Sequence, residues 1–364
     1  MSLWLTQILA VMRLEIKKTF FARRGLWIYL LALAPVAIFA LGAFMSRNFQ
    51  VFETTLPAGV HLLTDEQLDS VQSGMTRAQI VALLGEPPRT RTRRLHGFDQ
   101  DNKPIIVQQE DMRYYGENRS LILDLRDGVV GSIMSRGRSS FDQMSYAFAT
   151  VFQFFFIRLA IFFGCLGIFM NLFRGEMVDK SLHYYLLSPI RREVLLVGKF
   201  LAGVVASAVI FTTSTGLQLI AYLSAFDAAT VSRYFNQDHG TSQVAAYLGV
   251  TVLACIGYGS VFLGGGLLFR NPIFPAAAVL IWEAANPLLP ALLKKFSVIY
   301  YLKSLCPVPV AAPPGMPALF KLLVSSGDPI SAYLAVLGLL ALAAVVLWAC
   351  TFKIRKLEIN YTTE

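Results

Sequence analysis

Long apolar stretches that carry almost no charge restrict the fold of this sequence more than any other feature. Several of them exceed about 18 residues, the length that an α-helix needs to cross the hydrocarbon core of a membrane. Only 15% of the 364 residues are charged, whereas a soluble domain usually carries about 25%. We therefore predict an all-α polytopic membrane protein with about six transmembrane helices. The predicted spans are 25–45, 146–172, 200–226, 244–269, 273–293 and 330–352.

The positions of Lys and Arg predict the orientation of these spans. The net charge is +9, but the basic residues gather beside the apolar stretches, which is typical of topological anchoring rather than of nucleic-acid binding. If the N-terminus is cytoplasmic, the segments on that side hold 14 Lys and Arg, and the short outer loops hold 5. Long translocated segments do not follow this rule. We therefore predict a multi-pass protein of the bacterial inner membrane that contacts the lipid bilayer, keeps both termini in the cytoplasm and binds no nucleic acid.

Residues 1–45 are predicted to hold an interfacial helix followed by the first span. In residues 3–24, apolar side chains recur on one helical face and basic side chains supply the other. This pattern is typical of a helix that lies in the plane of the membrane surface. A plain anchor in front of the first span is the alternative interpretation.

Residues 46–145 form a polar segment between the first two spans, and its length suits one small extracytoplasmic domain. Two helices are predicted, over 64–74 and 76–85, because each begins at a threonine and ends at a glycine. Gln79 stands three residues after the second threonine, as in a capping box. Three strands are predicted after them, PIIVQQEDMRYYG, SLILDLRDG and VVGSIMS, with an Asp-Gly turn between the last two. The segment is therefore predicted to be a small α+β domain.

This order of elements resembles the SmpA/OmlA (BamE-like) family of small envelope domains. The resemblance is carried by SGMTRAQIVALLGEPPRT, then RYYG, then LILDLRDGVVGSI, and it covers about 70 residues. It implies an α+β domain that contacts an envelope protein rather than a catalytic domain. The chain lacks the lipoprotein signal of that family, so outer-membrane anchoring is not implied. A generic α+β insertion is the alternative interpretation.

Residues 173–199, FRGEMVDKSLHYYLLSPIRREVLLVGK, join the second and third predicted spans on the cytoplasmic side. Ser188 and Pro189 predict the start of a helix, since Ser favours the cap and Pro the first helical position. Apolar and charged residues alternate around this break, so the segment could seat in a groove of a partner and orient there by charge. The candidate residues are Gly175, Glu176, Asp179, Leu186, Leu187, Pro189, Arg191 and Arg192.

This segment resembles the one between spans two and three in the permease subunits of type-2 ABC exporters. The match consists of Gly175-Glu176, Leu186-Leu187, Pro189, Arg192 and Gly198-Lys199. In that family the segment holds a short coupling helix that docks on a partner ATPase. The interfacial helix, the six spans and the Pro-rich outer loop 294–329, where such permeases place short helices that dip back towards the membrane, also agree. A solvated loop that only carries anchoring charges is the alternative interpretation.

The resemblance implies partners that this chain does not encode. No Walker A sequence, Gly-x-x-x-x-Gly-Lys-Ser/Thr, occurs in the chain, and we find no catalytic, cofactor or metal site in the sequence. ATP and magnesium are therefore expected on a separate ABC ATPase subunit. A second permease copy or a paralogue is expected as well, because one chain supplies about six spans.

Two charged residues are predicted near the middle of spans, Arg158 in 146–172 and Glu283 in 273–293. A charge at the centre of the bilayer costs at least about 2.5–3.5 kcal/mol, so such residues normally pair or face a cavity. We predict that the two neutralise each other, within one subunit or across a dimer, either near a transport path or as a purely structural pair.

Three functions compete for this sequence. The first is the permease of an ATP-driven exporter with an unidentified substrate. The second is a membrane-anchored envelope assembly or scaffold protein that acts through its outer domain. The third is an ion-coupled secondary transporter, which predicts internal repeats that the sequence does not show.

Overall fold

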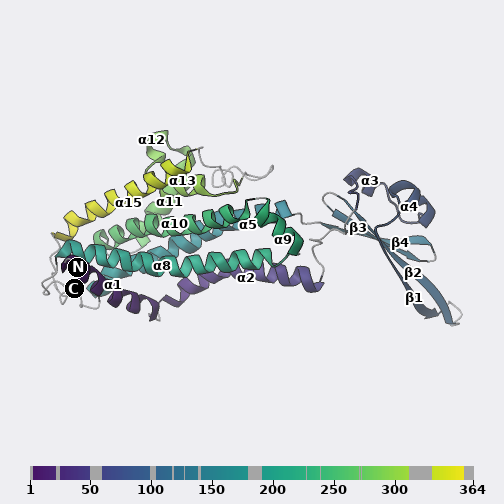
Figure 1. Cartoon of the computed structure of the whole chain (residues 1–364), viewed down its shortest axis with the longest axis horizontal. Helices are drawn as coiled ribbons and strands as arrows, with labels where there is room; N and C mark the ends of the chain where they lie inside the picture. Colours follow the sequence, from purple (N-terminus) through teal and green to yellow (C-terminus); the bar gives the residue numbers. More distant parts are fainter. Residues whose placement is uncertain are drawn as a thin grey trace. The chain divides into compact units, whose positions relative to one another are not determined.

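The computed structural model of the chain describes residues 3–21, 25–49, 60–98, 104–116, 119–126, 128–137, 141–178, 191–226, 228–237, 239–269, 271, 273–310 and 330–355. The chain divides into two compact units, which we call the bundle unit and the sheet unit (Figure 1). The bundle unit comprises Met1–Phe39, Tyr146–Ala221 and Tyr234–Glu364, and the sheet unit comprises Ala40–Ser145 and Tyr222–Arg233.

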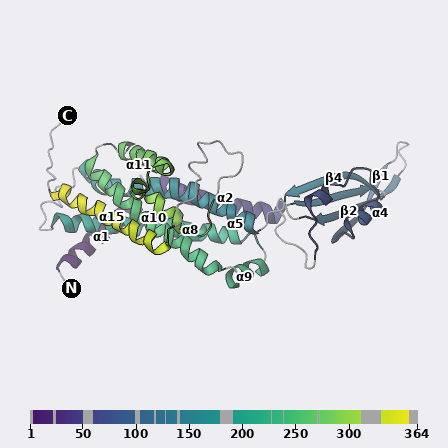
Figure 2. The ribbon, with the colours of Figure 1, turned by 90° about the horizontal axis from the view of Figure 1, so that it is seen from above.

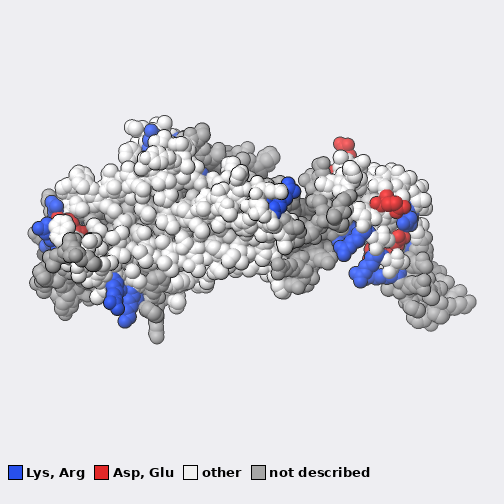
Figure 3. All heavy atoms as spheres, in the orientation of Figure 1, with Lys and Arg blue, Asp and Glu red and all other residues white. Residues whose placement is uncertain are grey.

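Among the described residues, five helices are long and apolar enough to cross a membrane, and they agree with five of the predicted spans. They are α2 (Leu26–Phe49), the continuous run of α5 (Phe141–Val151), η2 (Phe152–Ile161) and α6 (Phe162–Val178), and then α8 (Arg192–Leu223), α10 (Gly240–Leu268) and α15 (Ala332–Arg355). Helix α10 packs against α6 and α15, and its course beside α15 can be followed in Figures 1 and 2. Most of the described bundle surface in Figure 3 carries no charged residue, as expected for helices in contact with lipid. The chain is therefore a multi-pass membrane protein.

Two further helices, one shifted boundary and one π-helical run complete this description of the long helices. Helix α1 (Leu3–Phe21) precedes α2, as predicted, and α9 (Ala228–Asn236) lies between α8 and α10 in the chain, where no helix was predicted. The third span begins at Arg192 rather than at residue 200. The run η2 is a π-helix, which the sequence pattern did not indicate.

The predicted span 273–293 is wrong as a single membrane-crossing helix. The structure divides it into α11 (Ile273–Ala285), a 3-10 turn η3 (Asn286–Leu288) and α12 (Ala291–Lys294). Pro287 and Pro290 cause this break, because proline lacks the backbone N–H that the helical ladder requires. The apolar run Ile273–Leu288 is therefore shorter than a full span.

The predicted outer loop 294–329 contains one described helix, α13 (Val298–Leu305). Its residues 298–302 are buried, and the helix packs against α10 and α15. The chain therefore packs against α10 and α15 again after α12, and its dipping back towards the membrane stays a prediction. Residues 311–329 lie outside the described residues.

The sheet unit is built on a four-stranded antiparallel sheet in the order β1-β2-β3-β4. The strands are β1 (Arg89–Phe98), β2 (Pro104–Tyr115), β3 (Arg119–Arg126) and β4 (Val129–Gly137). Strands β2, β3 and β4 were predicted, but β1 was not. Its sequence, RTRTRRLHGF, lacks the alternating apolar residues that indicate a strand. β1 lies at an edge of the sheet, and charged side chains commonly protect such edges from further pairing.

Two short helices, α3 (Asp65–Asp69) and α4 (Arg77–Leu84), belong to this unit as well. Both have the capping box, with Thr64 and Gln67 at α3 and Thr76 and Gln79 at α4. The prediction of a helix over 64–74 is wrong in its length. Beyond α3 the chain bonds to β4 instead, since the N–H of Gly74 donates to the carbonyl of Val130 at 3.0 Å.

The core of the sheet unit is apolar and is formed by elements that are close in sequence. Both helices, the segment between them, and β2, β3 and β4 contribute buried side chains to it. These residues are Leu68, Val71, Ile80, Leu84, Met112, Tyr114, Leu121, Leu123, Leu125 and Val130.

Candidate functional site

The segment predicted to couple with an ATPase is flanked by α6, which ends at Val178, and α8, which begins at Arg192. The intervening residues 179–190 lie outside the described residues, and they include Asp179, Leu186, Leu187 and Pro189. The described candidate site is therefore the base of this segment, at the ends of α6 and α8 and the helices that contact them.

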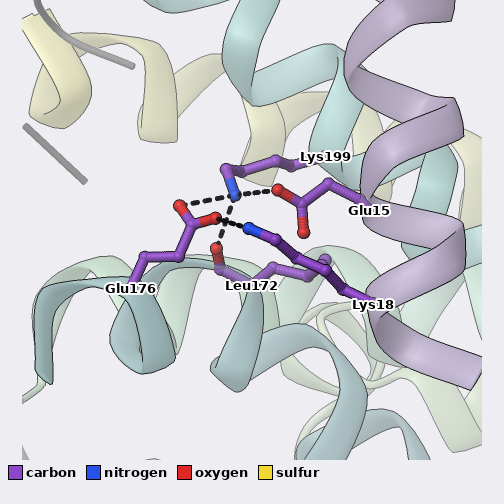
Figure 4. Close-up of polar contacts among 5 residues, drawn as sticks. All are labelled: Glu15, Lys18, Leu172, Glu176 and Lys199. Atoms are coloured by element: carbon purple, nitrogen blue, oxygen red, sulfur yellow. Dashed lines mark hydrogen bonds and ion pairs between the residues drawn. The ribbon is translucent and has the colours of Figure 1, made fainter. Parts of the chain in front are cut away.

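Lys199, in the second turn of α8, is the centre of a buried ion network (Figure 4). Its ammonium lies 2.6 Å from Oε1 of Glu15 on α1 and 2.7 Å from Oε2 of Glu176 on α6. It also donates a hydrogen bond of 2.8 Å to the carbonyl oxygen of Leu172. Lys18, on the same helix as Glu15, lies 3.1 Å from the other carboxylate oxygen of Glu176. We call Glu15, Lys18, Glu176 and Lys199 the four-residue network; it joins α1, α6 and α8.

The network is electrically balanced, with two carboxylates and two ammonium groups. The side chain of Lys199 is 0% exposed, and those of Glu15 and Glu176 are 4% and 8% exposed. Burying an isolated ion costs several kcal/mol, so these groups depend on one another. Burial raises the pKa of Glu15, and the neighbouring Lys199 opposes this shift. The aromatic ring of Phe173, 5.4 Å from the ammonium of Lys199, adds a cation–π contact.

The local sequence explains why α1 reaches this position. Val11 and Glu15 are four residues apart and both are buried, so they lie on one face of α1. That face contacts α8 at Gly198, where an added Cβ would come within 3.0 Å of the side chain of Val11. The absent side chain of Gly198 therefore permits the close approach that brings Glu15 to Lys199.

The start of α8 is also tied to the end of α15. Nη1 of Arg192 donates hydrogen bonds to the carbonyl oxygens of Ile354, at 3.3 Å, and Arg355, at 2.7 Å. These carbonyls lie at the negative end of the α15 dipole, where a guanidinium is favourable. Nε of Arg355 lies 2.7 Å from Oε1 of Glu193. Each of the two helices therefore contributes a charged side chain to the contact between them.

The other predicted residues at this base make fewer contacts. The guanidinium of Arg191 lies 5.0 Å from the ring of Trp4, which connects α8 to the start of α1. Gly175 lies in no tight contact, since an added Cβ would meet only the side chain of Asn171, at 3.9 Å. Glu176, Arg191 and Arg192 therefore lie at the ends of α6 and α8 that flank the segment, and their coupling role stays a prediction.

Sequence reasoning missed Glu15 as part of this site. A signal was present, because Glu15 is the single acidic residue before Glu53 and it stands on the apolar side of an amphipathic helix. An acid in that position needs a partner from another helix. Its partner, Lys199, lies 184 residues away in the sequence, so the sequence pattern could not identify it.

Within this chain, the structure does not join Arg158 and Glu283 by an ion pair. The carboxylate of Glu283 accepts hydrogen bonds from the hydroxyl of Tyr258 at 2.8 Å and from the N–H of Ile299 at 3.2 Å. Arg158 lies on η2 with its guanidinium 5.7 Å from the ring of Phe154. Tyr258 and the backbone of α13 therefore bind the carboxylate directly, and the mutual neutralisation of Arg158 and Glu283 within one subunit stays a prediction. The intersubunit form stays a prediction.

Across the parts of the chain that the structure describes, no group of three or more His, Cys, Asp or Glu is placed to hold a metal ion.

Comparison with known proteins gives one match. The family described as ABC-2 family transporter protein matches residues 9–268. The matched range contains α1, α6 and α8, and so all four residues of the network. No curated protein and no solved structure matches the chain.

Proposed function

Because this chain belongs to the ABC-2 family of transporter proteins, and is therefore a membrane permease of an ABC transporter, we propose that it exports its substrate from the cytoplasmic side of the bacterial inner membrane. Both termini and the segment 179–190 face the cytoplasm in this proposal, in which the broken run from α11 to α13 supplies the sixth crossing between α10 and α15. The segment docks on a separate ABC ATPase and carries the coupling residues Leu186, Leu187 and Pro189. The observation that carries the proposal is the four-residue network at the base of the segment.

The network connects a docking segment to the helices that must move. Glu176 stands just before the segment and Lys199 just after it, and both are held to the same α1 helix. Buried ion pairs with this geometry resist separation, because opening them leaves an uncompensated charge. A push on the segment is therefore shared by α6, α8 and α1.

The second connection extends this coupling to α15. Arg192 binds the final carbonyls of α15 directly beside the segment. ATP and magnesium bind the partner subunit. This partner is an ABC ATPase, because the family of the permease implies one. A second permease copy or a paralogue completes the transporter, and this chain contributes binding and transmission rather than hydrolysis.

The test is the stimulation of ATP hydrolysis in proteoliposomes that contain this chain and the ATPase that co-purifies with it. Leu186→Ser and Arg192→Gln are expected to lower the permease-dependent ATPase rate several-fold while the complex still assembles. Arg13→Gln, at an exposed position of α1, is the matched control for loss of one charge and should leave the rate unchanged. Normal stimulation by both test variants in an intact complex would remove the coupling role.

Topology is tested separately, by labelling a cysteine placed at Ser188 in a variant without its native cysteines. The proposal expects a membrane-impermeant maleimide to label this position only after the cells are permeabilised. Labelling in intact cells would place the segment outside and exclude docking on a cytoplasmic ATPase.

A second role is supported by the sheet unit, which we propose to be an extracytoplasmic, SmpA/OmlA-like domain that binds an envelope protein. Arg89, Arg91 and Arg93 alternate along β1 and therefore share one face of the sheet, and all three are exposed. Such a face suits an acidic protein surface. Replacing all three arginines by Ser should abolish crosslinking to the envelope partner and leave ATPase stimulation intact. If the cells then lose the function of this protein although stimulation is normal, the scaffold role is favoured.

A further inference from the structure

A cavity of about 460 Å³ lies between α10, α11 and α15 in the bundle unit. It is lined by α10 from Val261 to Phe269, by α11 from Pro275 to Val279 and by α15 from Val345 to Lys353. These are the last turns of α10 and α15 and the first turns of α11, so the cavity lies where the chain passes from α10 to α11. Its volume falls in the range of about 300–1,000 Å³ that is typical of small-molecule sites.

Two adjacent glycines of α10 give the cavity its shape. An added Cβ at Gly264 would lie 3.1 Å from Sγ of Cys350 on α15. An added Cβ at Gly265 would lie 3.1 Å from Cβ of Pro275 on α11. Both neighbouring helices therefore pack closely on α10 at consecutive positions, so α10 forms the floor of the cavity and α11 and α15 form its walls.

The mouth of the cavity faces outward from the bundle and is apolar. On its walls Ala278, Val345 and Ala349 are exposed, whereas the two glycines of the floor are buried. Apart from Lys353, the described lining residues are aliphatic residues, alanine, glycine, proline, phenylalanine and cysteine. In a bundle that crosses a membrane, an exposed apolar mouth of this kind contacts lipid chains, which are as apolar as leucine.

The cavity extends over most of the height of one leaflet. Val261 and Phe269 are eight residues apart, as are Val345 and Lys353, and eight residues of helix rise about 12 Å. Half of the hydrocarbon core of a bilayer is about 15 Å thick. One helical turn with its side chains, about 10–12 Å wide and about 5.4 Å long, occupies about 420–610 Å³. A helix of a second copy could therefore only lie across the mouth, whereas a narrow, flexible acyl chain can enter.

Lys353 supplies the polar end of the site. It is the single charged residue among the described residues that line the cavity, and it is exposed in the last turn of α15. Since none of these lining residues carries a carboxylate, the ammonium favours an anionic group at the mouth. Basic groups between transmembrane helices bind anionic lipid headgroups in this way. The alternative role for Lys353 is a plain interfacial anchor, which selects no particular lipid.

We propose that this cavity binds an anionic glycerophospholipid. One acyl chain lies between α11 and α15 on the floor formed by α10, and the phosphate pairs with Lys353. The bound lipid lies next to the contact between α8 and α15, because Lys353 directly precedes Ile354, whose carbonyl oxygen accepts a hydrogen bond from Arg192. Naming the surrounding leaflet as cytoplasmic rests on the proposed function, whereas lipid binding does not.

Tryptophan quenching by a brominated lipid tests this proposal on the full chain in bilayers. The four native tryptophans are replaced by Phe, and Phe269→Trp places one tryptophan on the cavity lining. The bilayers contain dioleoyl phosphatidylcholine and rising fractions of brominated dioleoyl phosphatidylglycerol. Quenching should show an about five-fold preference for phosphatidylglycerol, the effect expected of one basic residue near an anionic headgroup. A chain that retains only Trp27, which is 40% exposed and does not line the cavity, should show no preference.

Charge variants of the Phe269→Trp chain test the headgroup. Lys353→Gln should abolish the preference, and Lys353→Glu should reverse it in favour of phosphatidylcholine. Lys17→Gln, which removes one charge from an exposed position of α1, is the matched control and should keep the preference. Inorganic phosphate added to the bilayers should leave the quenching unchanged, because the acyl chain is needed for binding.

Cavity-filling variants of the same chain test the acyl chain. Ala349→Phe fills the cavity from α15 and should abolish the preference. Ala344→Phe, the same change at an exposed position of α15 outside the lining, should keep it. Ala278→Phe fills the cavity from α11 and should act like Ala349→Phe, so it covers the case in which the variant of α15 does not fold.

The proposal is overturned if the tryptophans at positions 269 and 27 report equal preferences, or if Lys353→Gln keeps the full preference. Retention of the preference in both cavity-filling variants, or displacement of the lipid by inorganic phosphate, would overturn it as well. No ATPase is present in this assay, so such a failure leaves the coupling role untouched. Conversely, loss of coupling in the Arg192→Gln variant does not alter the lipid preference.

Discussion

The bundle unit and the sheet unit bury different kinds of side chain. The sheet unit encloses an apolar core in which residues such as Leu123 and Ile80 are fully buried and come from neighbouring elements of the chain. Besides many buried apolar side chains, the bundle unit also buries Glu15, Glu176 and Lys199, which come from three separate helices. Local pattern is enough to build the first core, whereas the second needs partners that only the assembled bundle supplies. The sheet unit thus has an apolar core of its own, whereas the four-residue network lies in the region proposed to transmit motion.

The largest effect is expected from Lys199→Met in the bundle unit. This change leaves Glu15 and Glu176 buried without their shared counter-ion, and breaking such a pair costs about 3–5 kcal/mol. Unfolding of the full chain in mixed micelles, followed by circular dichroism, measures the loss. Lys18→Met is the control, because the side chain of Lys18 is 51% exposed, and it should cost less than about 1 kcal/mol. Equal losses would show that the network is not a buried unit.

The second largest effect is expected in the sheet unit. Leu123→Ala removes a side chain that is 0% exposed and should cost about 2–5 kcal/mol. Hydrogen exchange of the full chain should show faster exchange in β2, β3 and β4 while α8 and α10 keep their protection. Leu83→Ala, at a position that is 46% exposed, is the control. Faster exchange throughout the bundle as well would contradict the division into separate cores.

A smaller effect is expected where α1 approaches α8. Gly198→Ala places a methyl group 3.0 Å from the side chain of Val11, and overpacking of this kind costs about 1–3 kcal/mol. Gly216→Ala is a matched control on the same helix, since nothing lies within 4 Å of its added Cβ, and it should be neutral or stabilising by up to about 1 kcal/mol. Thermal unfolding of both variants decides the point, and a neutral Gly198→Ala would mean that α1 does not need this contact.

The cap of α4 tests how far local sequence stabilises the sheet unit. Thr76→Ala removes the side chain that accepts from the N–H of Gln79, and loss of such a cap costs about 1 kcal/mol. Local hydrogen exchange at the first turn of α4 should rise by the corresponding factor of about five. Thr76→Asp, which restores an acceptor, should recover the protection. Failure of Thr76→Asp to differ from Thr76→Ala would assign the effect to something other than capping.

The smallest effect is expected from a single hydrogen bond in the same unit. The hydroxyl of Tyr114 donates to the carbonyl of Gly85 at 2.9 Å, and Tyr114→Phe should cost about 0.5–1.5 kcal/mol. Burial raises the pKa of Tyr114 to about 12. Because this folded-state pKa is raised, the stability it contributes is present below about pH 10 and is lost as the pH rises towards 12. Absorbance at 295 nm, compared between the unmodified chain and Tyr114→Phe, follows the ionisation, and titration near pH 10 would contradict the burial.

Much of this protein follows from local patterns in the sequence. Apolar length located five spans, because a bilayer requires about 20 apolar residues in a row. The two threonines at 64 and 76 located helix starts, because a cap is formed by residues three positions apart. The same reasoning failed for β1, whose pairing with β2 compensates for a charged sequence, and for 273–293, where the apolar run was long enough but the prolines divided it.

The candidate site shows where such reasoning ends. The sequence alone predicted that Glu176, Arg191 and Arg192 belong to one coupling segment, and that Arg158 and Glu283 are charges that need compensation. Only the tertiary structure decided the partners: Lys199 for Glu15 and Glu176, the end of α15 for Arg192, and Tyr258 for Glu283. The physical reason is that a buried charge requires a counter-charge or a hydrogen bond. The packing of helices that are distant in the sequence determines which group supplies it.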